Sequence, residues 1–240
     1  MVQIDAAQLA RSLHRLEPVS AGDITTALQQ VITACVELFR VTGSGLMIAD
    51  EDNILRAAVA SDGPSRALEE VQARTGQGPC VDSFVNRQVV TADDLGADNR
   101  WPESREALIR NGVRAVLGVP VVLGGVTIGS LDLYMDRPHR WDDSECDALV
   151  RYSGILEATL DAALRARHSG ELADQLQFAL DNRVVIDRGV GFLMAAYRVD
   201  AVTAFNILRR TARNQRRRAV EVARHLLDTG ALPDLSDPRR

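Results

Sequence analysis

The sequence predicts an α+β domain followed by a small all-α helical bundle. Apolar residues recur at helical spacing on both sides of a central region of β-rich runs, and those runs end before Glu171. The charge also divides the chain. The first 170 residues hold sixteen arginines and twenty-four acids, a formal charge of −8, whereas Arg183 to Arg224 holds ten arginines and three acids, a charge of +7. We therefore predict two modules with different partners.

The first module is expected to open with an amphipathic helix, Ile24–Phe39. Gly43–Asp50 and Leu55–Ser61 follow as two short strands joined by an acidic turn. A helical segment, Arg66–Arg74, then leads into a glycine-rich loop, Gly76–Cys80.

The strongest β signal comes next. After a brief strand at Val89-Val90 and a polar loop, Val113–Val122 and Val126–Tyr134 are apolar runs separated by a Gly-Gly pair. Paired glycines supply the positive φ angles of a tight hairpin. The domain should close with the helix Asp142–Leu164, with Asp142 or Asp143 as its N-cap.

The second module contains only helical patterns. One leucine stripe continues beyond a break at 168–170 and another apolar stripe runs from Phe205 to Leu226, with Asp200 as a predicted N-cap and Gly230 as the end. The predicted organisation is an N-terminal segment 1–19, a sensor-like domain 20–165, a helical linker or coiled-coil seam 166–182, a helical domain 171–232 and a disordered tail 233–240. The leucines on both sides of Gly170 predict a homodimer seam.

Bulk properties are those of a soluble globular protein, with 46% hydrophobic and 25% charged residues. No apolar run approaches the roughly 18 residues of a membrane span, and the first residues do not form a secretory signal. Three cysteines at unpatterned spacings argue against a disulfide framework or a zinc site. We expect a cytoplasmic protein that does not bind a membrane.

The basic stretch can be interpreted either as a solvent-exposed helix face or as a binding surface. Drawn on one continuous helix, Arg210, Arg213, Arg217 and Arg224 fall within about 60° of one another beside an apolar stripe. In the first interpretation the arginines have no partner other than water. However, few acids relieve the repulsion, and guanidinium groups suit phosphates and unpaired bases. The pattern therefore favours a polyanionic partner.

Residues 176–226 resemble the ANTAR family of RNA-binding antiterminators. The matching positions are Arg183, Ile186, Asp187, Gly191, Leu193, Met194, Ala204, Phe205, Leu208, Arg209, Asn214, Arg217, Val222 and Ala223. The resemblance implies a dimer that binds paired mRNA stem-loops with short loops and prevents a terminator hairpin from forming. The RNA-binding residues it predicts are Arg183, Arg188, Arg209, Arg210, Arg213, Asn214, Arg216, Arg217 and Arg218.

The chain departs from that family's pattern in two places. Gly189-Val190-Gly191 stands where Ala-Lys-Gly is usual, and Ala212-Arg213 with Arg216 stands where Ser-Gln and a later Asn are usual. These changes bear on RNA affinity and on loop preference, since base-edge contacts tolerate exchange less well than phosphate contacts. Gly189 is also interpreted as a close approach of two helices.

Residues 20–165 resemble a GAF domain. The resemblance rests on the amphipathic helix, the hairpin, the loop Gly76–Cys80, the run Gly112–Pro120, the run Gly129–Tyr134 and the closing helix. It implies a sensor for a small ligand, which the sequence does not identify. The signature of cyclic-nucleotide-binding members is absent, so a cyclic nucleotide is not expected, and no cofactor is predicted. A GAF domain before an ANTAR domain is a layout typical of actinobacterial regulators.

No catalytic or metal-binding motif is found, so we predict no enzyme and no metal site. Cys80 is interpreted as a small buried residue of its loop rather than a bilin or redox site. Asp93, Asp94 and Asp98 are interpreted as loop caps rather than catalytic carboxylates.

The sequence thus predicts a GAF–ANTAR regulator of transcription antitermination. The alternatives are a DNA-binding regulator, a protein-interaction module and a ligand-loaded sensor enzyme. The ligand, the RNA target and the direction of the response stay open at this stage.

Overall fold

The computed structural model describes residues 4–16, 24–50, 53–165 and 171–233, without the side chains of 171–176 and Ala179. The predicted helix break at 168–170, part of the acidic turn and most of the predicted tail lie outside these residues.

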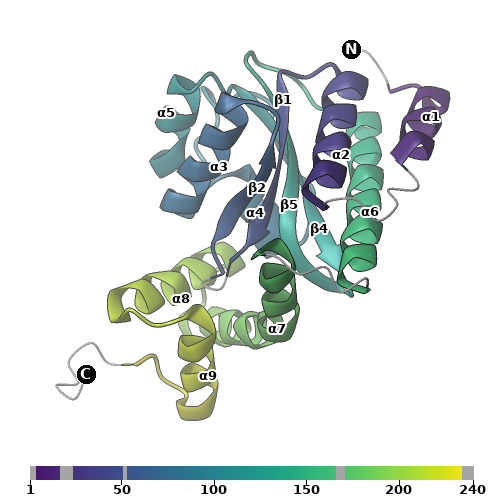
Figure 1. Cartoon of the computed structure of the whole chain (residues 1–240). Helices are drawn as coiled ribbons and strands as arrows, with labels where there is room; N and C mark the ends of the chain where they lie inside the picture. The colour runs from purple at the N-terminus through teal and green to yellow at the C-terminus, as the bar shows by residue number, and fades with distance from the viewer. Residues whose placement is uncertain (1–3, 17–23, 51–52, 166–170, 234–240) are drawn as a thin grey trace.

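A five-stranded antiparallel sheet forms the centre of the N-terminal domain, with strand order β2-β1-β5-β4-β3 (Figure 1). The strands are β1 Gly43–Ala49, β2 Leu55–Ala60, β3 Val90–Ala92, β4 Ala115–Leu123 and β5 Val126–Met135. Both predicted hairpins, β1–β2 and β4–β5, are confirmed. Leu123 pairs with Val126, and the two glycines between them have φ of 57° and 79°, as a type I′ turn requires.

One face of the sheet is covered by α2 (Ile24–Phe39) and α6 (Asp143–Arg165), with α1 (Ala6–Leu16) outside them. The core on this face is almost wholly apolar. Asp142 caps α6 as predicted: its carboxylate accepts a hydrogen bond from the Glu145 amide at 3.0 Å, and the Glu145 carboxylate accepts one from the Asp142 amide at 2.9 Å. This reciprocal pair is a capping box.

The other side carries three helices: α3 (Gly63–Thr75), α4 (Pro79–Asn86) and α5 (Pro102–Arg110). The predicted helix at Arg66–Arg74 is confirmed within α3. Helices α1, α4 and α5 were not predicted. Both α4 and α5 begin with proline at the first helical position, where the missing N–H costs nothing, and both are too short for a clear periodic pattern.

Three helices follow: α7 (Glu171–Tyr197), α8 (Ala201–Gln215) and α9 (Ala219–Thr229). Asp200 caps α8 by accepting from the Thr203 amide at 2.7 Å, and Gly230 ends α9 at φ 74°. Both predicted boundaries are confirmed. Gly189 also behaves as interpreted, because a Cβ there would lie 3.0 Å from the Cβ of Ala223 on α9, whereas Gly191 faces open space.

The prediction of one continuous helix through the basic stretch is wrong. Arg216 adopts the left-handed conformation, with φ 52°, and ends α8. The chain then turns through Arg217 and Arg218 before α9 begins. The arginines therefore surround a corner between two helices instead of forming one straight ridge.

The predicted leucine seam at 166–182 stays a prediction, because residues 166–170 and the side chains of 171–176 lie outside the described part of the chain. Leu156 and Leu160 are fully buried in the core between α6 and the sheet, and Leu180 packs against the same core. Val184, at 45% exposure, lies outside that core. The apolar stripe on α6 is thus explained by burial within one chain, which removes its argument for a dimer.

Helix α7 packs against strands β1 and β5 at the end of the sheet, α8 packs against α4, and α9 packs against α7 and α8 (Figure 1). The Phe84 ring of α4 meets the Phe205 ring of α8 edge-on, with centroids 6.0 Å apart. One cluster of buried apolar residues therefore continues from the sheet into the C-terminal helices. Among the described residues no single helix is long and apolar enough to cross a membrane; the end of α7 with α8 meets that test only as a pair bent by 110°.

Candidate nucleic-acid interface and interdomain pocket

A cavity of about 740 Å³ lies between the N-terminal domain and the C-terminal helices. Seven of its thirteen lining residues are arginines and two are glutamates. The arginines are Arg56 on β2, Arg74 on α3, and Arg209, Arg213, Arg216, Arg217 and Arg218 at the α8–α9 corner. Five of the nine predicted RNA-binding residues thus gather around one hollow.

Backbone hydrogen bonds fix the α8–α9 corner. The Arg216 amide donates to the Arg213 carbonyl at 3.1 Å, and the Arg217 amide donates to the Ala212 carbonyl at 3.0 Å. The Arg218 guanidinium lies 5.7 Å from the centroid of the Phe178 ring on α7. The arginine side chains therefore project from a defined turn and not from a frayed helix end.

Carboxylates compensate only part of this charge. Arg217 pairs with Glu221 at 3.5 Å, and Arg56 pairs with Asp50 at 2.7 Å. In the described part of the chain, Arg74, Arg213 and Arg216 have no carboxylate within 4.0 Å. The cavity therefore carries an excess of positive charge that favours anions.

Arg209 lines the cavity and is only 7% exposed. Its Nη2 donates to the Ala73 carbonyl on α3 at 2.8 Å, while its buried Nε has no hydrogen-bond partner among the described residues. Burial, and next the charge of Arg213, lower its pKa to about 10. Asn206, one turn earlier, donates to the Gly76 carbonyl at 3.0 Å.

Arg183 lies in a different environment, 3% exposed between α7 and α4. Its guanidinium stacks 3.9 Å from the centroid of the Phe84 ring, and its Nη1 donates to Asn53 Oδ1 at 2.9 Å. Its Nε lies 3.0 Å from Asp187 Oδ1 in an ion pair that is not aligned as a hydrogen bond, and Asp187 also pairs with Arg87, the C-cap residue of α4. Burial lowers the pKa of Arg183 to about 10, and Asp187 opposes that shift.

The remaining predicted residues lie outside the cavity. Arg188 and Asn214 are exposed, and Arg210 is an exposed side chain 3.6 Å from Glu103 of α5. Val190 and Ala212, two positions that depart from the family pattern, are 7% and 4% exposed within the helical core. Val190, which stands where the family usually has lysine, is thus part of the helical core.

Comparisons with known proteins agree with this architecture. Residues 23–160 match the GAF domain family, and residues 174–227 match the ANTAR domain family. The chain belongs to the GAF family, and an ANTAR domain follows its GAF domain. No protein with a curated function was found to be similar.

Solved structures share the GAF fold. A GAF domain from an Acinetobacter phosphoenolpyruvate-protein phosphotransferase aligns with a TM-score of 0.53 at 15% identity, over 69% of this chain and 98% of the other. Free methionine-R-sulfoxide reductase from Neisseria meningitidis aligns with a TM-score of 0.53 at 19% identity, over 66% of this chain and 89% of the other. A domain of a putative two-component sensor histidine kinase from Sinorhizobium meliloti 1021 aligns with a TM-score of 0.50 at 21% identity, over 62% of this chain and 100% of the other. At these identities the likeness shows the fold alone.

The GAF core contains a polar cluster that the sequence analysis missed. Glu69 of α3 and Asp132 of β5 are fully buried, and none of their carboxylate oxygens has a hydrogen-bond partner in the described chain. Burial, and next the Asp132 charge, raise the pKa of Glu69 to about 10, and burial raises that of Asp132 well above its ordinary value. The sequence does contain a signal for this cluster: Asp132 stands between Leu131 and Leu133 in an apolar run that predicts a central strand.

Cys80 belongs to the same cluster. Its amide donates to Gln72 Oε1 at 2.9 Å, and Gln72 Nε2 donates to its sulfur at 3.0 Å. The side chain is fully buried, and burial raises the pKa of the thiol well above its ordinary value. This environment is that of a structural thiol and not of a reactive one.

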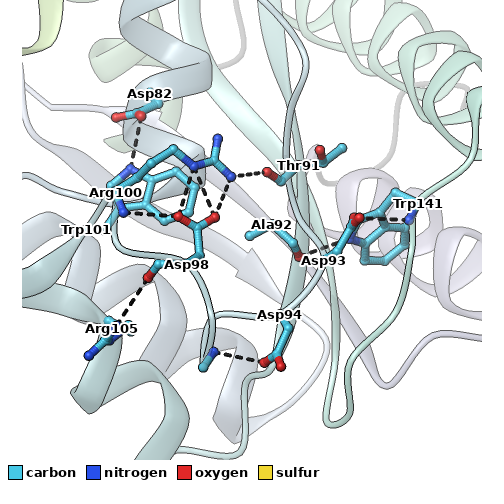
Figure 2. A network of polar contacts seen from close by, with 11 residues as sticks. Asp82, Thr91, Ala92, Asp93, Asp94, Asp98, Arg100, Trp101, Arg105 and Trp141 are labelled. Atoms are coloured by element: carbon cyan, nitrogen blue, oxygen red, sulfur yellow. Dashed lines mark hydrogen bonds and ion pairs between the residues drawn. The ribbon is translucent and has the colours of Figure 1, made fainter.

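The acidic loop of the GAF domain is held by its own side chains (Figure 2). Asp94 accepts from the Gly96 amide at 2.8 Å, Asp98 accepts from the Arg100 amide at 3.0 Å, and Asp93 accepts from the Trp141 amide at 3.3 Å. Asp94 and Asp98 each cap a turn, so the interpretation as loop caps is confirmed for these two, whereas Asp93 joins the loop to Trp141 in a distant segment.

Proposed function

We propose that this protein binds RNA through its ANTAR domain and prevents transcription termination, under the control of its GAF domain. The observation that carries this proposal is the arginine corner between α8 and α9 in a chain segment that matches the ANTAR family. The RNA is expected to be a pair of mRNA stem-loops with short loops, bound by a homodimer in the cytoplasm, where nascent mRNA is made.

The contacts of the arginines suggest separate roles. Arg213 and Arg216 have exposed guanidinium groups that meet phosphates, and Asn214, on the same exposed turn, contacts a base edge. Arg183 and Arg209 are held by the GAF domain through Asn53 and the Ala73 carbonyl. These two arginines reach RNA only after the ANTAR helices separate from the GAF domain.

The GAF domain therefore acts as a restraint on the ANTAR domain in this proposal. A signal that favours the separated state raises RNA affinity, because it releases Arg183 and Arg209 together. A ligand shifts such an equilibrium only by binding the two states unequally.

The first experiment is a titration of the full chain with tandem short-loop stem-loops, scrambled-loop RNA and duplex DNA of equal length. We expect the tandem stem-loops to bind most tightly. If about four phosphates are contacted per subunit, the logarithm of the affinity falls with the logarithm of salt at a slope near −3. Preference for duplex DNA, or a flat salt response, contradicts the proposal.

A matched pair of variants locates the binding surface. Arg213→Ala removes a charge from the ANTAR corner, and Arg110→Ala removes the same charge from an exposed site on α5 of the GAF domain. We expect Arg213→Ala to weaken RNA binding and to make the salt slope shallower by the amount that one phosphate contact contributes, about 0.7. Arg110→Ala should bind RNA about as tightly as the wild type. Equal effects of the two variants would assign the binding to net charge alone.

A further inference from the structure

The interdomain cavity has walls from both domains. Arg56 and Arg74 come from the GAF domain, and Arg213 and Arg216 come from the end of α8 in the ANTAR domain. Its volume of about 740 Å³ lies within the range of roughly 300–1,000 Å³ found for small-molecule sites. The hollow exists only while the two domains are docked.

The charge of this cavity is not balanced from within. Of its two acids, Glu69 is fully buried and is kept neutral near pH 7 because burial raises its pKa to about 10, and Glu70 is the exposed one. Seven guanidinium groups share the same walls. An anion in the cavity relieves their mutual repulsion.

Two buried donors give independent support for a ligand. Arg209 Nε and Arg217 Nη1 are both inaccessible to solvent and have no hydrogen-bond partner within the described ranges. Both residues line the cavity. Buried donors are nearly always paired in proteins, so these two guanidinium groups keep hydrogen-bonding capacity that no group of the described chain uses, and each would turn toward the hollow to reach a ligand oxygen.

The remaining lining is apolar. Ile54, Ala57, Ala73 and Ala212 offer a surface suited to carbon atoms of a ligand. A single phosphate group presents only about three acceptor oxygens, fewer than the donors gathered here. Arginine binds phosphate oxygens in bidentate fashion, and linked phosphates allow several arginines to do so together.

We propose that this cavity binds a small molecule with two or more linked phosphate groups, and that the bound molecule holds the GAF and ANTAR domains together. The site goes beyond the proposed function, but its regulatory consequence rests on it. A ligand that binds only the docked state lowers RNA affinity, and RNA lowers the ligand's affinity by the same factor.

The test is calorimetric titration of the full chain with ATP, inorganic tripolyphosphate and adenosine, at one low salt concentration. We expect saturable binding of ATP and at least tenfold weaker binding of adenosine. Tighter binding of ATP than of tripolyphosphate assigns the site to nucleotides, and the reverse assigns it to inorganic polyphosphate. Absence of binding by both phosphate compounds overturns the proposal.

Variants on the two walls separate an interdomain site from a general anion surface. Arg74→Ala and Arg213→Ala should each weaken binding of the phosphate compounds about tenfold, whereas Arg110→Ala, an exposed GAF arginine outside the cavity, should not. If Arg213→Ala weakens binding and Arg74→Ala does not, the anion lies on the ANTAR surface alone and the interdomain site is excluded.

The two proposals fail in different ways. RNA binding by the wild-type chain without phosphate-compound binding contradicts this site and leaves the proposed function intact. Binding of ATP or tripolyphosphate without RNA binding contradicts the proposed function and leaves the site. When both bind, ATP or tripolyphosphate should reduce RNA affinity, and an increase would overturn the proposed link between ligand and docking.

Discussion

Two arginine environments lie within one basic stretch of the ANTAR domain. Arg183 is buried and has an aromatic ring, an amide oxygen and a carboxylate around it. Arg213 and Arg216 are exposed at the rim of a cavity with few acids. The first environment fixes a cation that holds two domains together, while the second leaves cations available to an anion. Residue type alone does not separate these roles; the partners do.

The largest expected effect tests the buried environment. Arg183→Ala removes the cation between Asn53 and Asp187 and leaves a void beside Phe84. We expect a loss of roughly 3 kcal/mol in the free energy of unfolding, at the low end for breaking a buried ion pair, because Asp187 keeps Arg87. For a chain of this size the melting temperature should fall by roughly 6–12 °C.

Arg213→Ala is the matched change in the exposed environment. Surface substitutions usually stay within about 0.5 kcal/mol, so its melting temperature should remain close to that of the wild type. Similar losses for the two variants would show that the two environments do not differ in energy, and the comparison would fail.

The next effect concerns Glu69, the buried acid in the cavity wall. The pKa of Glu69 is raised in the folded chain from an ordinary 4.5 to about 10. Its contribution to stability is therefore complete below about pH 4.5 and is lost as the pH rises toward 10. We expect stability to fall by up to about 1.4 kcal/mol per pH unit between pH 6 and 8.

Glu69→Gln removes this ionisable carboxyl and should reduce the pH dependence, as measured by chemical denaturation at several pH values, while the contribution of Asp132 remains. Glu70→Gln removes a neighbouring exposed carboxylate and should leave most of the slope. A slope unchanged in Glu69→Gln would mean that the carboxyl is ionised in the folded protein, paired with a cation that the described chain does not supply.

A third test addresses the contact of α8 with the GAF domain. Gly76 has φ 70°, and a Cβ there would collide with Asn206 and Arg209 of α8. Gly112 has φ 82° and open space around it. Alanine at either site carries backbone strain on the order of 1 kcal/mol, but only Gly76→Ala also displaces the Asn206 and Arg209 side chains that join α8 to the GAF domain.

Hydrogen exchange of the α8 amides separates the two effects. We expect faster exchange along α8 in Gly76→Ala and unchanged exchange there in Gly112→Ala. Equal protection in both variants would show that Asn206 and Arg209 adjust without loss of docking.

The last test concerns RNA affinity. Arg87→Glu places a carboxylate against Asp187 and should open the α4–α7 contact, which frees Arg183. We expect roughly tenfold tighter RNA binding, about 1.4 kcal/mol. Arg110→Glu makes the same charge change at an exposed α5 site, and added negative charge alone should weaken RNA binding. A weaker affinity for both variants would remove docking as a restraint.

Much of the fold was predictable because its signals are local. The Gly124-Gly125 turn, the caps at Asp142 and Asp200 and the apolar strand pairs each need only neighbouring residues. The break at Arg216 was not predictable in this way. A non-glycine residue in the left-handed conformation ends α8 there, and the apolar spacing continues across the break.

The site was predictable only in part. The sequence shows the basic residues in the segment that matches the ANTAR family, and the structure gathers five of the nine predicted RNA-binding residues around one cavity. Among their GAF partners, Asn53 lies 130 residues from Arg183 along the chain, and Arg87 lies 100 residues from Asp187. No local pattern links such positions, so the burial of Arg183 and the second wall of the cavity required the fold.

The shared apolar cluster around Phe84 and Phe205 limits how the two domains can be exchanged in evolution or separated as fragments. Two sequence families meet in this protein, yet the boundary between them crosses a single packed interior. Cutting the chain between the families would expose Phe84 on one fragment and Phe205 on the other. Recombination that exchanges one domain for a homologue must preserve this pair of complementary surfaces. The unit that evolution joined from two parts is thus expected to melt as one.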